Sequence, residues 1–187
     1  MQTQEQSIEF ARSLKAHDHA VVFYEEPDEK WRLISNFLGQ SLKFGEPAFY
    51  VCYFEDPDMV RDSLKGHGID VRPHERRGSF RILELGDQVR AEEFDTIASA
   101  LKLAYAELSK SDGMIRAAAD STLTIKNGYT QQLLNYERWI GKTVGLPIAG
   151  VCAYDAEAAT TPSDEFFLEL LRLHGHVIFP GIAVSLV

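Results

Sequence analysis

The stretch from His19 to Leu42 constrains the fold of this chain more than any other. It opens with Ala20–Tyr24, a short apolar run of β-branched and aromatic residues that is typical of a strand buried on both faces. Pro27 then suits the first turn of a helix, and apolar residues recur behind it at helical spacing. A strand, a tight turn and a helix in this order predict the first unit of an α/β domain.

The turn of this unit is acidic, with Glu25, Glu26, Asp28 and Glu29 and no glycine. In many nucleotide-binding folds the same turn is a glycine-rich loop, whose backbone N–H groups and a lysine hold phosphates. Four carboxylates would repel a triphosphate. A later Gly141-Lys142-Thr143 lacks the other glycine of such a loop and ends a predicted helix. The sequence therefore indicates a nucleotide-binding architecture without its phosphate-binding loop.

The rest of the chain alternates between apolar strands and amphipathic helices. Strands are predicted at residues 48–54, 80–85, 114–119, 148–154, 177–179 and 182–187, and helices at about 57–66, 94–108, 128–144 and 166–174. This alternation predicts an α/β fold: a mainly parallel sheet with helices on both faces. Pro180-Gly181 between the last two strands indicates a C-terminal antiparallel hairpin. Residues 1–16 are interpreted as an N-terminal helical extension of one domain, residues 17–187.

Composition narrows the classes of partner. The 187 residues carry a formal net charge of -9, which argues against direct binding of nucleic acid. No apolar run approaches the ~20 residues that span a bilayer, and the polar N-terminus is no signal peptide. The two cysteines, Cys52 and Cys152, lie in apolar runs and fit a reducing compartment. We expect a cytoplasmic protein without a membrane partner.

The residues that end the strands are the first candidates for a site, because ligands of open α/β sheets bind outside the carboxyl ends of the strands. Tyr24, Asp120, Tyr154 and Asp155 lie at these ends, and Arg116 lies within one of the strands. A rim of aromatic rings and carboxylates suits a small, largely apolar or cationic ligand better than a phosphate. The alternative for each tyrosine is packing, with a buried ring and a wet hydroxyl.

Glu137 lies at the border of the apolar face of the helix predicted at 128–144, which indicates a half-buried carboxylate. Such a group needs a cationic or hydrogen-bonding partner. Arg116 is the candidate, as a structural ion pair or as part of a site.

His19, His174 and Cys152 carry donor atoms of the kind that bind soft metals. The sequence has no CxxC, HxxxH or HExxH spacing, so it predicts no metal site. It also contains no Gly-x-Ser-x-Gly motif, and we predict no catalytic residue and name no cofactor.

Several of these residues together resemble the MEDS domain, a sensory domain named after methanogens, methylotrophs and the dichloromethane-responsive repressor DcmR. The matching blocks run in family order from about residue 17 to 179. They are Asp18-His19-Ala20 with Tyr24, Gly45-Glu46, Arg116-x-x-x-Asp120, Tyr136-Glu137, Cys152-x-Tyr154-Asp155 and Leu173-His174. Ala119-Asp120 departs from the Gly-Glu pair that is usual in the family.

The resemblance implies a RecA-like or KaiC-like core that has lost its nucleotide loop, and a sensory role for small hydrocarbon-derived ligands rather than catalysis. The ligand-binding candidates are His19, Tyr24, Arg116, Asp120, Glu137, Cys152, Tyr154, Asp155 and His174. MEDS domains are often joined to a DNA-binding or kinase domain. We expect this chain to act alone and to signal through a protein partner or as a homo-oligomer.

Two alternatives stay open. The first is a divergent RecA-type ATPase, against which the acidic turn speaks. The second is a protein-interaction module without a ligand, marked by an exposed apolar patch.

Overall fold

A central sheet of mainly parallel strands forms the core of the protein in the computed structural model. The structure describes residues 4–108, 114–143, 145–179 and 182–186. In this part of the chain, seven strands form one sheet in the order β3-β2-β4-β5-β1-β6-β7. They are β1 His19–Tyr24, β2 Ala48–Cys52, β3 Phe80–Glu84, β4 Ile115–Asp120, β5 Ile148–Asp155, β6 His176–Phe179 and β7 Ile182–Ser185. All neighbours pair in parallel except β6 and β7, which are antiparallel. The predicted fold class is confirmed, whereas the predicted turn at Pro180-Gly181 lies outside the described residues.

Six of the described helices have ten or more residues: α1 Gln4–Ser13, α2 Pro27–Lys43, α3 Pro57–Gly66, α6 Phe94–Leu108, α8 Thr130–Thr143 and α10 Asp164–Leu173. Four have five residues: α4 Arg72–Arg76, α5 Gly86–Arg90, α7 Thr122–Lys126 and α9 Ala156–Thr160. The sequence predicted the long helices, α1 among them as an N-terminal helical extension, and missed the short ones, since five residues are too few to show helical periodicity. No helix in the described ranges has the length and apolar character needed to cross a membrane.

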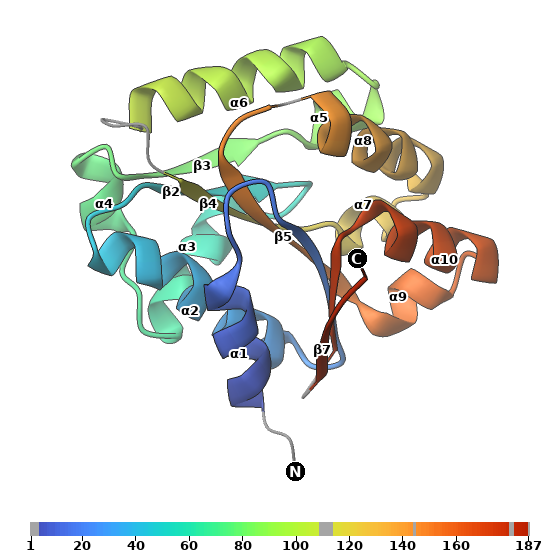
Figure 1. The fold of residues 1–187 in the computed structure, drawn as a ribbon. Coiled ribbons are helices and arrows are strands. Elements are labelled where there is room, and N and C mark those ends of the chain that lie inside the picture. Colours follow the sequence, from blue (N-terminus) through green and yellow to red (C-terminus); the bar gives the residue numbers. More distant parts are fainter. Residues whose placement is uncertain (1–3, 109–113, 144, 180–181, 187) are drawn as a thin grey trace.

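The helices form two layers, one on each face of the sheet (Figure 1). Helices α1, α2 and α3 pack on the face that we call the α2 face, and α6, α8 and α10 pack on the other, the α8 face. Strand residues alternate between these faces, so that Val22 of β1 belongs to the first core and Val21 to the second. Each face has its own apolar core. A polar side chain on a strand therefore contacts the helices of one face and is separated by the sheet from those of the other.

The acidic turn between β1 and α2 is closed by its own carboxylate. The side chain of Glu29 accepts hydrogen bonds from the backbone N–H groups of Glu25 and Glu26, at 3.1 and 3.2 Å. Pro27 occupies the first helical turn, where its missing N–H group costs nothing. The N–H groups that face a phosphate in a nucleotide-binding turn are therefore already satisfied within the chain.

Candidate functional site

The structure distributes the predicted ligand-binding residues over three places, so the expectation of a single rim is wrong. His19, Glu137, Cys152, Tyr154 and His174 lie together on the α8 face, Tyr24, Asp120 and Asp155 lie at the carboxyl edge, and Arg116 lies on the α2 face. Two simple causes separate them. His19 and Tyr24 are at opposite ends of β1, and successive residues of a strand point to opposite faces.

Arg116 has partners of its own on the α2 face. Its guanidinium donates hydrogen bonds to the Ser41 hydroxyl at 2.8 Å and to the backbone carbonyl of Arg12 at 3.0 Å, and lies 3.5 Å from the Glu46 carboxylate. Burial lowers the pKa of Arg116. The predicted contact between Arg116 and Glu137 is not made, because the sheet separates the two side chains.

At the carboxyl edge, Tyr24, Lys30, Tyr50, Glu55 and Asp120 form a buried group that we call the carboxyl-edge network. Asp120 accepts hydrogen bonds from the Tyr24 hydroxyl at 2.8 Å and from the Lys30 ammonium at 2.5 Å. Glu55 accepts from the Tyr50 hydroxyl at 2.8 Å and lies 3.7 Å from Lys30. Burial, and then the charge of Asp120, raise the pKa of Glu55 to about 8.

The polar groups of this network satisfy one another, which favours a structural role. Asp155, the remaining candidate at this edge, caps α9 by accepting from the backbone N–H of Ala158 at 2.8 Å. Lys30 and Glu55 are not among the residues predicted from the sequence. A signal for Lys30 was available, because it lies one turn before Ile34 on the apolar stripe of α2.

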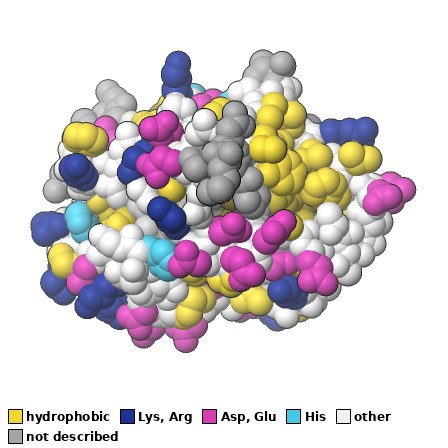
Figure 2. Space-filling model, turned by 90° about the horizontal axis from the view of Figure 1, so that it is seen from below, with side chains coloured by type: hydrophobic (Ala, Val, Ile, Leu, Met, Phe, Trp, Pro, Cys, Tyr) yellow, Lys and Arg dark blue, Asp and Glu magenta, His cyan; other side chains and the backbone are white. Residues whose placement is uncertain are grey.

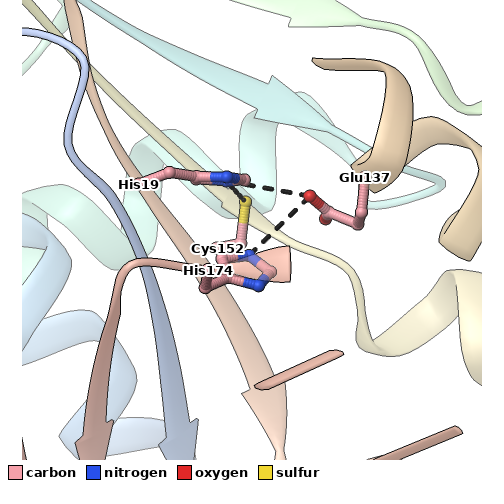
Figure 3. A group of neighbouring side chains, drawn as sticks. All are labelled: His19, Glu137, Cys152 and His174. Atoms are coloured by element: carbon pink, nitrogen blue, oxygen red, sulfur yellow. Dashed lines mark hydrogen bonds and ion pairs between the residues drawn. The ribbon is translucent and has the colours of Figure 1, made fainter. Parts of the chain in front are cut away.

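On the α8 face, four side chains converge in what we call the His–Glu–Cys cluster: His19, Glu137, Cys152 and His174 (Figure 3). They come from the amino end of β1, from α8, from β5 and from the residue that follows α10. The Nε2 atom of His19 lies 3.1 Å from the Cys152 Sγ atom and 3.7 Å from Glu137 Oε2, and His174 Nε2 also lies 3.7 Å from Glu137 Oε2. All four donor atoms lie within 4.8 Å of one another.

Strand register and a glycine place the His19 ring in this cluster. His19 is the pairing partner of Gly150, and Val21 is the partner of Cys152, so His19 and Cys152 lie on one face of neighbouring strands. A Cβ atom at Gly150 would lie 3.2 Å from Cδ2 of His19. The missing side chain of Gly150 therefore leaves room for the imidazole, which also lies against the His174 ring at 4.2 Å between centroids.

The surroundings of the cluster favour the uncharged forms of His19, Cys152 and Tyr154. Burial, and then His174, lower the pKa of His19 well below its usual value. Burial, and then the charge of Glu137, raise the pKa of the Cys152 thiol and of the Tyr154 hydroxyl. Tyr154 donates a hydrogen bond of 2.7 Å to the Oε1 atom of Glu137. Imidazole, thiol and carboxylate are all donor types that bind transition metals in proteins.

A cavity of about 150 Å³ borders the cluster on the α8 face. Small residues form its floor, because Ala117 and Ala119 of β4 lie beside Gly150 and Cys152 of β5. Ala117 stays half-buried in the middle of a central strand, as expected where the space above it is not filled. The remaining wall includes Phe49, Val51, Tyr53, Leu101, Tyr136, Ile140, Leu146 and His19. The pocket therefore lies on the α8 face and not at the carboxyl edge, where it was predicted, and the adjacent small residues of β4 and β5 are the sequence signal for it.

Comparisons with known proteins agree with this architecture. A short segment of 48 residues is 42% identical to a UPF0273 protein of Pyrococcus horikoshii and covers 26% of this chain and 19% of the relative. The corresponding protein of Pyrococcus furiosus is 40% identical over 48 residues, with the same shares. The chain thus spans about a fifth of the curated relatives that it matches.

The crystal structure of a KaiC-like protein of Pyrococcus horikoshii superimposes with a TM-score of 0.63 at 14% identity, and covers 88% of this chain and 71% of that protein. This likeness shows a RecA-like α/β fold. The profile of the methanogen/methylotroph, DcmR sensory domain matches residues 18–175, which include the His–Glu–Cys cluster, the carboxyl-edge network and the lining of the cavity except His17. The chain belongs to the MEDS family of sensory domains.

Proposed function

We propose that this protein is a sensory module that binds a small, largely apolar molecule in the cavity on the α8 face. The observation that carries the proposal is the cavity itself, about 150 Å³ in volume and lined mainly by aliphatic and aromatic side chains. An apolar cavity of this size accommodates a molecule such as benzene or xenon. His19 and Cys152 supply polar atoms at one wall, the usual combination in a small-molecule site.

The test uses benzene as a probe and a variant that fills the cavity. Ala117→Leu places a larger side chain above the floor, whereas Ala106→Leu makes the same change on the exposed side of α6. Since a ligand selective for the folded state raises the Tm, benzene should raise the Tm of the wild type and of Ala106→Leu. It should leave the Tm of Ala117→Leu unchanged. Equal responses in both variants, or no response in the wild type, would contradict the proposal.

The alternative function is that of an enzyme, a RecA-type ATPase. The contacts at the carboxyl edge of the sheet do not support it. Glu29 occupies the N–H groups of the β1–α2 turn, and Lys30 is held by Asp120. A lysine in a buried hydrogen bond is not available to a phosphate without breaking that bond.

For the output of the signal, we propose self-association through β7. Among the described residues β7 pairs with β6 alone, and its Ile182 and Val184 are exposed, as is Leu186 just beyond it. An exposed edge strand with apolar side chains is a template for pairing with another chain. Figure 2 shows hydrophobic side chains gathered on this side of the molecule, beside a row of acidic ones.

Sedimentation over a range of protein concentrations tests this second step. The wild type should form dimers at high concentration, and Val184→Lys should stay monomeric, because a lysine on an edge strand opposes pairing with another chain. Leu103→Lys introduces the same charge at an exposed leucine of α6 and should associate like the wild type. If the wild type stays monomeric at all concentrations, self-association through β7 is wrong, and the signal would pass to a different protein partner.

A further inference from the structure

We propose that the His–Glu–Cys cluster is a binding site for one divalent transition metal ion of the zinc class. The proposal stands on the cluster and does not depend on what occupies the neighbouring cavity. His19, His174, Cys152 and Glu137 supply two imidazoles, one thiolate and one carboxylate, a complete set for a four-coordinate ion.

The hydrogen-bond donors and acceptors of the cluster indicate a bound ion. His174 Nδ1 lies 2.8 Å from the backbone carbonyl of Leu170, which can only accept, so Nδ1 carries the proton. In the neutral imidazole the Nε2 atom of His174 is then a bare lone pair, and it faces Glu137 Oε2 at 3.7 Å. Neither atom has a hydrogen-bond partner in the described structure, and both side chains are nearly fully buried. Two buried acceptors aimed at each other are costly unless a cation lies between them.

The spacing of the donors also fits. With bonds of roughly 2.0–2.3 Å to zinc, the edges of a tetrahedron measure about 3.3–3.8 Å. Three donor pairs of the cluster lie 3.1, 3.7 and 3.7 Å apart, at or near this range, and no pair exceeds 4.8 Å. Small side-chain rotations would bring the four atoms to equal distances from one ion.

Charge and outer contacts complete the fit. Glu137 and the thiolate of Cys152 together neutralise a divalent ion, and the two neutral imidazoles add no charge. Binding would displace one proton from the thiol to solvent as the sulfur–metal bond forms. The backbone carbonyl of Leu170 orients His174, and the hydroxyl of Tyr154 orients Glu137, as outer partners orient ligands in zinc sites. Magnesium and calcium prefer oxygen donors and are poor candidates for this set.

The experiment treats the 187-residue chain with a chelator and titrates it with Zn²⁺, and separately with Co²⁺ as a spectroscopic substitute. We expect one ion per chain, release of about one proton per ion near neutral pH, and a rise in Tm on binding. Cobalt should give a sulfur-to-metal charge-transfer band. Binding of no ion, or of several ions of similar weak affinity, would overturn the proposal.

The two cysteines provide a matched control. Cys52 and Cys152 are both free and buried, but only Cys152 belongs to the cluster. Cys152→Ala should lose the charge-transfer band and weaken zinc binding at least tenfold, whereas Cys52→Ala should keep both. A band that survives in Cys152→Ala, or disappears in Cys52→Ala, would show that the metal binds elsewhere.

Glu137→Gln separates a metal site from a purely structural cluster. A glutamine amide can donate to the bare Nε2 atom of His174, so this variant should have a higher Tm than the chelator-treated wild type and a lower affinity for zinc. If Glu137 instead forms a structural ion pair with protonated His174, the variant should have a lower Tm and zinc should have no effect on either protein. That second pattern would overturn the proposal.

Discussion

Tyr154 and Glu137 join the sheet to the helix that covers it, because the Tyr154 hydroxyl donates to the Glu137 carboxylate at 2.7 Å with both side chains buried. Removing this hydroxyl leaves a buried charge with one bond fewer. Tyr154→Phe should therefore lower the free energy of unfolding by about 1.5–3 kcal/mol, the range for hydrogen bonds to charged groups.

Tyr53→Phe is the matched comparison, since Tyr53 donates to the neutral Tyr136 hydroxyl at 2.7 Å. We expect about 0.5–1.5 kcal/mol for this neutral pair. Urea denaturation of both variants measures the two values, and a smaller loss in Tyr154→Phe than in Tyr53→Phe would mean that Glu137 is not ionised.

Arg116 should be coupled to Ser41 and not to Glu137. A double-mutant cycle of Arg116→Met with Ser41→Ala should show an interaction of roughly 1 kcal/mol, because the two side chains share a buried hydrogen bond. The cycle of Arg116→Met with Glu137→Gln should be additive within about 0.5 kcal/mol, since the sheet lies between them. Coupling in the second cycle would contradict the placement of the two residues.

Glu55 should make the protein less stable as the pH rises. Its pKa is raised from 4.5 to about 8 in the folded state, so between these values the folded chain holds a proton that the unfolded chain has released. The free energy of unfolding of the wild type, relative to Glu55→Gln, should fall over this window by at most about 1.4 kcal/mol per pH unit. It should level off above pH 8.

Urea titrations of both proteins at a series of pH values measure this difference. His19 changes stability in the opposite sense, because its lowered pKa costs stability as the pH falls below its usual value, but this effect is common to both proteins and cancels. A difference that does not vary with pH would show that Glu55 is ionised throughout.

Mg-ATP should not bind at micromolar concentration. The phosphate-facing N–H groups of the first turn are taken by Glu29, and the neighbouring carboxylates repel a polyanion. Calorimetric titration is the measurement, and heat of binding with a micromolar Kd would promote the ATPase alternative over the sensory one.

The architecture could be predicted because it depends on patterns within short windows. The apolar run at Ala20–Tyr24 and the helical stripe of α6 each show a period that only one element type fits. The closing hairpin was likewise visible as two apolar runs beside Pro180-Gly181. Short helices such as α7 have no room for a period and were missed.

The site could be predicted only as a list of residues, since its geometry depends on contacts between distant positions. His19 and Cys152 are 133 positions apart and meet because β1 pairs with β5 in one particular register. Motifs such as CxxC detect ligands that are neighbours in the chain, and none of the cluster members are. Arg116 was assigned the wrong partner because the register of the sheet decides whether a residue of β4 points toward α8 or toward α2. The sequence alone does not give this register.

Strand β1 links two polar groups of different chemistry. His19 at its amino end belongs to the His–Glu–Cys cluster, and Tyr24 at its carboxyl end belongs to the carboxyl-edge network, roughly 16 Å away at ~3.3 Å per residue. Hydrogen bonds to β5 on one side and β6 on the other keep the strand from bending or stretching. Because the register of β1 with both neighbours is fixed, the imidazole and the phenol are held at a constant separation, and the two polar groups share one rigid element.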